Sequence, residues 1–140
     1  MAAGVIPYLM FNGNCEEAFS TYEKLMGAKK DTLMRFRDAP MGPGETCPEL
    51  LKDKIINMSF HLNGVLMMAS DAPPDRYSKP AGFGMALRYD TVAEVQRVFN
   101  GLAEGGKVGM PLQETFYAHS FGMLTDRFGI PWMVIAQKRL

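Results

Sequence analysis

The order of strand-forming and helix-forming segments occurs twice along this chain of 140 residues. In each half, one β-rich segment precedes a segment with helical periodicity, and three further β-rich segments follow. A supersecondary unit that repeats within one chain indicates a duplicated module. We therefore predict an α+β fold of two βαβββ modules, over about residues 1–72 and about residues 81–140, within a single domain.

The first module opens with a β-rich segment at residues 5–11, which ends at the turn dipeptide Asn12-Gly13. We expect Asn14 to cap the helix that follows, with Glu17 completing a capping box. Gly27 ends this helix. Its apolar face comprises Ala18, Phe19, Tyr22, Leu25 and Met26.

The rest of the first module is predicted to be strands and loops. Residues 32–37 form a strand, and residues 38–53 form a loop with three prolines and two glycines. Residues 55–70 form a hairpin around the Asn63-Gly64 turn. Residues 71–80 contain three prolines and link the two modules.

The second module repeats this order. Thr91 and Glu94 form a capping box at the start of its helix, which ends at Gly105-Gly106. The apolar face of this helix comprises Val95, Val98, Phe99 and Leu102. The predicted strands cover residues 83–89, 107–116, 119–125 and 130–136.

A single helix covers only one face of a four-stranded sheet, so the other face is buried elsewhere or serves as a site. We expect two curved mixed sheets that enclose a shared cavity. The chain has twelve methionines, several of them at strand positions. Their unbranched thioethers either fill irregular gaps in the core or line an adaptable apolar cavity.

The composition argues against several classes of partner. Fifteen acidic residues balance fifteen basic ones, so no net positive field favours nucleic acid or an anionic membrane. No apolar run approaches the roughly 18–20 residues that cross a bilayer, and no secretory leader is recognisable. We expect a cytoplasmic protein in which Cys15 and Cys47 are reduced thiols.

The most specific motifs are Phe121–Met133 and the preceding Gln113–His119, and the segments Tyr8–Ala18 and Met68–Ala72 agree with them. Through these motifs the chain resembles, over nearly its whole length, the PhnB-like family of the glyoxalase/bleomycin-resistance (vicinal-oxygen-chelate) superfamily. The resemblance implies the duplicated fold and a homodimer. Some relatives carry a demethylubiquinone methyltransferase label, but no predicted strand is followed by a Gly-rich turn suited to a nucleotide-like methyl donor.

Enzymes of that superfamily hold a divalent metal ion with His, Glu or Gln from the first and last strands of each module. Related glyoxalases place a carboxylate four residues after the glycine of the last turn, and in this chain that position is Met133. The corresponding segment of the first module, Leu66–Ala69, and residues 83–87 offer no such ligand, which leaves only Tyr8. Thioether and phenol groups do not replace the ligands that such ions prefer, so we predict no metal and no other cofactor.

Two residues are candidate catalytic groups, Glu114 and His119. Imidazole changes charge near physiological pH, although a histidine at a strand end can also simply satisfy a backbone carbonyl. Glu114 is a candidate for ligand contact or general-base chemistry. Alternation along a strand would place Gln113, Thr115 and Tyr117 on the opposite face from Glu114, so that only one of the two sets lines the pocket.

Four other residues have both structural and functional interpretations. We expect Asp126 to accept hydrogen bonds from the amides of the following turn, and Asp71 to be a turn former. Trp132 is either a core anchor or the wall of a ligand site. Cys15 lies at a helix start, where the helix dipole lowers a thiol pKa, but no base for a nucleophile is recognisable near it in the sequence.

These observations favour a metal-independent protein that sequesters or senses a small apolar or aromatic molecule. The alternative is a lyase, isomerase or dioxygenase-like enzyme that uses Glu114 or His119 with a relocated metal or none, and a third possibility is a domain for protein contacts with a collapsed cavity. Asn57 stands where many relatives have histidine, which weakens an acid–base mechanism. The predicted ligand-binding residues are Tyr8, Met10, Asn57, Met68, Gln113, Thr115, Tyr117, Phe121 and Trp132.

Overall fold

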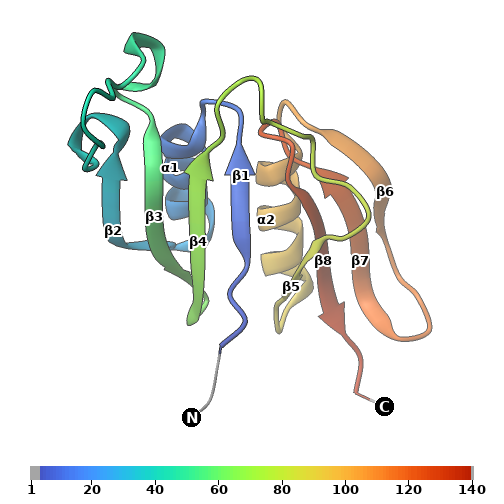
Figure 1. Ribbon diagram of the computed structural model, residues 1–140. Coiled ribbons are helices and arrows are strands. Elements are labelled where there is room, and N and C mark those ends of the chain that lie inside the picture. The colour runs from blue at the N-terminus through green and yellow to red at the C-terminus, as the bar shows by residue number, and fades with distance from the viewer. Residues whose placement is uncertain (1–3, 140) are drawn as a thin grey trace. The chain divides into compact units, whose positions relative to one another are not determined.

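The computed structural model describes residues 4–139, and the chain forms two compact units, Met1–Ser78 and Lys79–Leu140 (Figure 1). Each unit consists of one four-stranded sheet and one α-helix. The α+β class and the two βαβββ modules are therefore confirmed. The shared cavity and the single-domain organisation stay predictions.

In unit one the strand order is β1-β4-β3-β2, with β1 parallel to β4 and the other pairs antiparallel. Two short 3₁₀ helices, Phe36–Asp38 and Glu49–Leu51, lie in the connection between β2 and β3. The main elements are β1 (Tyr8–Phe11), α1 (Cys15–Met26), β2 (Lys29–Arg35), β3 (Ile55–Leu62) and β4 (Val65–Asp71).

In unit two the strand order is β5-β8-β7-β6, with β5 parallel to β8 and the other pairs antiparallel. The topology therefore repeats that of unit one. The elements are β5 (Met85–Arg88), α2 (Val92–Ala103), β6 (Lys107–Gln113), β7 (Ala118–Thr125) and β8 (Pro131–Gln137).

The predicted strand over residues 107–116 is too long, because β6 ends at Gln113. The next four residues form the connection to β7, in which the Thr115 amide donates to the Ala118 carbonyl at 3.0 Å and the Tyr117 amide donates to Thr115 Oγ1 at 3.3 Å. Strand alternation therefore does not apply to Glu114–Tyr117, and the predicted division of residues 113–117 into two faces is wrong.

Each helix buries its apolar side against one face of its own sheet, as predicted (Figure 1). In unit one the rings of Phe19 and Phe60 meet edge to face at 5.2 Å. In unit two α2 approaches β7 closely, because a Cβ atom at Gly122 would lie 2.6 Å from Cε2 of Phe99. A side chain at this position would push the helix away from the sheet.

The start of α1 differs from the prediction. Asn14 makes no capping hydrogen bond, whereas the buried carboxylate of Asp71 accepts from the amides of Cys15 and Ile55, both at 2.9 Å. Asp71 is thus more than a turn former, because it joins the end of β4 to the starts of α1 and β3. In unit two, the predicted contact between Thr91 Oγ1 and the Glu94 amide is present at 3.2 Å.

The second buried carboxylate, Asp126, follows β7 and confirms the predicted turn role. Its Oδ1 accepts from the amides of Phe128 and Ile130 at 2.9 and 3.0 Å, and its Oδ2 accepts from the indole N–H of Trp132 at 2.8 Å. The Asp126 carboxylate therefore holds both the backbone of the turn and Trp132, the largest side chain of the core.

We predict that Asp126→Asn lowers the free energy of unfolding by about 2–3 kcal/mol, because the amide nitrogen that replaces one oxygen cannot accept from its donor. Urea unfolding followed by tryptophan fluorescence measures this loss. The exposed Asp75→Asn is the matched control and should unfold like the wild type. Equal midpoints for Asp126→Asn and the wild type would contradict this role.

The environment of Cys15 also corrects the expected lowering of its pKa. Both cysteines are free thiols, and Cys15 is only 1% exposed. Burial, followed by the nearby charges of Asp71 and Glu16, raises the pKa of the Cys15 thiol far above its ordinary value. These effects outweigh that of the helix dipole, so Cys15 is a core residue with an unreactive thiol.

We expect Cys47→Ser to react with a disulfide reagent at pH 8 only after unfolding, because its remaining thiol at Cys15 is buried and protonated. Cys15→Ser, which keeps the half-buried Cys47, should react while folded. Absorbance of the released thiolate reports both rates. Rapid reaction of folded Cys47→Ser would show that Cys15 is accessible.

Candidate functional site

The face of each sheet that lies opposite its helix is called here the helix-distal face. Buried and partly exposed residues alternate along β3, β7 and β8, and the buried set faces the helix. The partly exposed residues therefore lie on the helix-distal face, where a ligand can reach them. A site in either unit is expected on this face.

In unit one the four predicted ligand-binding residues Tyr8, Met10, Asn57 and Met68 lie together on the helix-distal face. Tyr8 is aligned with Met68 in the parallel pair of β1 and β4. The Asn57 side-chain amide donates to the Tyr8 hydroxyl at 3.3 Å, and Ser70 Oγ donates to the Met10 sulfur at 3.6 Å. The polar groups of this face thus bond to one another beside exposed thioethers.

In unit two the helix-distal face carries a pocket of about 460 Å³. Met123 of β7 is aligned with Met133 of β8, and both side chains are on this face. The residues around the pocket are Gly82, Phe83, Gly84, Lys107, Gly109, Met123, Leu124, Thr125, Pro131, Trp132 and Met133.

Gly84 opens this pocket beside Met133. A Cβ atom at Gly84 would lie 3.4 Å from the carbonyl oxygen of Pro131 and 3.8 Å from Cε of Met133. The absent side chain therefore leaves space directly over the methionine. The ring of Phe83 is 62% exposed at the same end of β5 and offers an apolar surface.

The side chains at the expected metal positions do not fit a divalent ion. In unit one the aligned pair on the first and last strands is Tyr8 and Met68, and in unit two it is Ala86 and Met133. A phenol, two thioethers and a methyl group are poor ligands for Mg²⁺, Mn²⁺ or Zn²⁺. Over residues 4–139, moreover, no three His, Cys, Asp or Glu side chains are grouped so that they could hold a metal ion.

The other predicted ligand-binding residues of unit two are divided between several places. Gln113 ends β6 opposite Phe121 of β7, and the ring of Tyr117 meets that of Phe121 at 5.8 Å. Thr115 lies in the connection between these strands. Trp132 borders the 460 Å³ pocket, but it is 1% exposed and is held by Asp126, which fits the interpretation as a core anchor.

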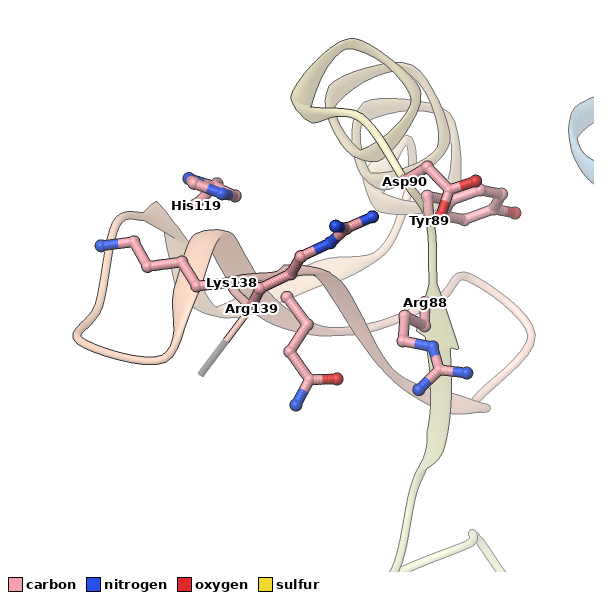
Figure 2. Close-up of a pocket in the computed structure, with 7 residues that line it drawn as sticks. Arg88, Tyr89, Asp90, His119, Lys138 and Arg139 are labelled. Carbon is pink, nitrogen blue, oxygen red and sulfur yellow. The ribbon is translucent and has the colours of Figure 1, made fainter.

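The candidate catalytic residues lie towards the other end of this sheet. Glu114 is exposed and forms an ion pair with Lys138 at 2.8 Å, which lowers the pKa of the Glu114 carboxyl, and His119 adds a smaller effect in the same direction. His119 lines a second hollow together with Lys138 (Figure 2). No hydrogen bond joins Glu114 to His119 within the described chain.

Four residues around the pocket were not among the predicted ligand-binding residues, namely Phe83, Gly84, Met123 and Met133. Met123 and Met133 were predicted only as strand methionines that either fill the core or line an apolar cavity, and Met133 also as a position without a metal ligand. Gly84 carries no side-chain chemistry, so only the register of β5 against β8 reveals its place.

Comparisons with known proteins agree with this fold. The sequence profile of the family described as 3-demethylubiquinone-9 3-methyltransferase matches residues 3–135. The protein YjdN of Escherichia coli (strain K12) is 37% identical over 95% of both chains. The crystal structure of protein PA1353 from Pseudomonas aeruginosa is 44% identical, with a TM-score of 0.84 over 96% of this chain and 97% of that one.

Two further structures extend the comparison. A Bacillus cereus PhnB protein, described as a putative 3-demethylubiquinone-9 3-methyltransferase, is 27% identical, with a TM-score of 0.78 over 95% of this chain and 98% of that one. The fosfomycin resistance protein FosX from Listeria monocytogenes is 10% identical, with a TM-score of 0.67 over 99% of this chain and 95% of that one, and it shows the fold alone.

Among residues 4–139, no helix is long and apolar enough to span a membrane. The motif resemblance, the profile match and the relatives all lead to the same assignment. The chain belongs to the family described as 3-demethylubiquinone-9 3-methyltransferase, which is the PhnB-like family, and it has the fold of the glyoxalase/bleomycin-resistance proteins.

Proposed function

We propose that this protein binds a small apolar or aromatic molecule without a metal ion, in the pocket on the helix-distal face of unit two, and that it acts by sequestering or sensing that molecule. The observation that carries this proposal is the apolar pocket around Met133, the residue that stands at the expected ligand position. A thioether that cannot serve a hard cation can still contact a ligand.

The lining of the pocket supports an apolar ligand. Met123 and Met133 supply adjacent flexible thioethers, and sulfur makes favourable contacts with aromatic rings. Phe83 adds a ring at the mouth. Lys107 and Thr125 are the polar side chains around the pocket, and a small number of polar groups is typical of a site that orients a largely apolar molecule.

The size of the pocket also supports this proposal. Its volume of about 460 Å³ lies within the range of roughly 300–1,000 Å³ that small-molecule sites occupy. An aromatic compound that binds here removes apolar surface of both the compound and the pocket from water. Each Å² of that surface contributes about 25 cal/mol to the favourable free energy of transfer. Sequestration or sensing needs this binding and no chemical step.

The enzymatic alternative has weaker support from the same geometry. The ion pair with Lys138 lowers the pKa of Glu114, which makes that carboxylate a weaker base. Glu114 also follows the end of β6, whereas the pocket adjoins Lys107 at the start of that strand. Glu114 and His119 stay predictions as catalytic residues.

For the methyltransferase activity that the family description implies, residues 4–139 show no recognisable site for a methyl donor. The turn from β1 to α1 contains one glycine, Gly13, and the first amide of α1 already donates to Asp71. This turn is therefore not the Gly-rich strand-to-helix turn that suits a nucleotide-like methyl donor. The cytoplasmic location and the homodimer stay predictions from the sequence.

We predict that Gly84→Leu lowers the affinity for a neutral apolar probe at least about tenfold, because the new side chain fills the space beside Met133. The probe is the uncharged dye 6-propionyl-2-(dimethylamino)naphthalene, whose emission shifts to the blue on burial. Wild-type protein should saturate with one dye per chain, and excess EDTA should leave its affinity unchanged.

The matched control is Gly4→Leu, the same substitution at a position with no atom within 4 Å of the added Cβ. Thermal melting of both variants shows that each is folded. The proposal is wrong if the dye does not bind the wild type, if EDTA abolishes binding, or if folded Gly84→Leu binds the dye like Gly4→Leu.

A further inference from the structure

Unit two carries a second hollow of about 700 Å³ at the opposite end of its sheet from the apolar pocket. It lies where the parallel strands β5 and β8 end, beside the start of β7 (Figure 2). Its chemistry differs from that of the apolar pocket, because nearly every lining side chain is charged or polar. These residues are Arg88, Tyr89, Asp90, His119, Gln137, Lys138 and Arg139.

The charges around this hollow are unbalanced. Three cationic side chains face one carboxylate, that of Asp90. Lys138 is already paired with Glu114 at 2.8 Å. Within residues 4–139, neither Arg88 nor Arg139 has an acidic side chain within ion-pair distance. Both guanidinium groups are therefore available to pair with an anionic ligand.

The strand geometry places these two arginines on the border of one hollow. Arg88 is the last residue of β5 and is aligned with Ile135 of β8, and Arg139 follows the end of β8. Figure 2 shows the Arg139 guanidinium extending towards the end of β5, where Asp90 lies, while Lys138 extends to the side of His119. Donors therefore surround the hollow from two neighbouring strands and from β7.

We infer that this hollow binds the phosphate group of a small hydroxylated phosphate ester, such as a sugar phosphate. Two guanidinium groups balance the two charges of a phosphate monoester, and their planar donor sets match its oxygens in paired hydrogen bonds. Lys138, Gln137 and His119 supply further donors. A volume of about 700 Å³ exceeds the need of a bare phosphate ion and leaves space for the rest of the ester.

Asp90 and Gln137 indicate the chemistry of the rest of the ester, beyond its phosphate group. The Asp90 carboxylate repels every anionic group, the phosphate included, so we expect the phosphate to bind the guanidinium groups and Asp90 to accept hydrogen bonds from hydroxyl groups of the ester. The side-chain amide of Gln137 both donates to and accepts from hydroxyls. The inference is independent of the proposed function, because the two sites share no lining residue.

Titration calorimetry of the purified wild-type chain at low salt tests this inference, with glucose 6-phosphate, inorganic phosphate and glucose as separate probes. Glucose 6-phosphate should bind saturably with a Kd of about 1 mM or tighter, inorganic phosphate should bind more weakly, and glucose should not bind. The affinity for glucose 6-phosphate should fall as salt rises from 50 to 200 mM.

The double variant Arg88→Gln/Arg139→Gln should lose at least about tenfold in affinity for glucose 6-phosphate. The matched control Arg76→Gln/Lys79→Gln also removes two positive charges, from exposed side chains that do not line the hollow, and should bind like the wild type. Gly84→Leu should also bind glucose 6-phosphate normally, which separates this site from the apolar pocket. Amide shifts in ¹⁵N spectra should cluster at residues 88–90 and 137–139.

Three results would overturn the inference. They are a lack of saturable binding of glucose 6-phosphate to the wild type, undiminished binding by a folded Arg88→Gln/Arg139→Gln variant, and an equal loss in Arg76→Gln/Lys79→Gln, which would reflect net charge alone. If inorganic phosphate binds as tightly as the ester, the assignment to a hydroxylated ester is wrong.

Discussion

One helix covers one face of a four-stranded sheet, and this constraint shapes both units of the protein. Alternation along the strands sends the residues that face α1 or α2 into a core and leaves the others on the helix-distal faces. The methionines follow this division, since Met58 and Met67 are buried in the core of unit one while Met123 and Met133 border the pocket of unit two. Methionines thus fill the core, and whether those beside the pocket contact a ligand stays a prediction.

Two buried carboxylates hold these layers in register. Asp71 joins the end of β4 to the first amides of α1 and β3, and Asp126 joins the turn after β7 to the indole of Trp132. Each carboxylate satisfies backbone donors that would otherwise be buried without partners. Because these groups are used in folding, they are not available for chemistry on the helix-distal faces. The side chains that remain for the proposed ligand contacts are thioethers, rings and the charged residues at the strand ends.

Local signals in the sequence predicted much of this fold. The Asn63-Gly64 turn, Gly27 and the Thr91–Glu94 capping box each marked an element boundary that the structure confirms. One error arose where a distant residue decides, because the Cys15 amide at the start of α1 donates to Asp71, 56 positions away, while Asn14 makes no capping hydrogen bond. Another arose at a local turn without glycine or proline, because β6 ends early where the Thr115 amide donates to the Ala118 carbonyl. The pocket beside Gly84 depends on the pairing of β5 with β8, which follows from the duplicated topology but is not visible in local periodicity. The grouping of Arg88 with Arg139 has the same origin, because the two residues are 51 positions apart in the sequence.

The proposed binding of an apolar molecule beside Met133 requires that the aligned positions Tyr8 and Met68 of unit one, and Ala86 and Met133 of unit two, hold no divalent cation. Elemental analysis of the protein, purified without chelators and dialysed after addition of Mn²⁺, Ni²⁺ and Zn²⁺, tests this claim most directly. The account predicts less than about one-tenth of an equivalent of any divalent metal per chain, because thioethers and phenols do not retain these ions. One equivalent that survives dialysis and is lost in a Tyr8→Phe variant would contradict it.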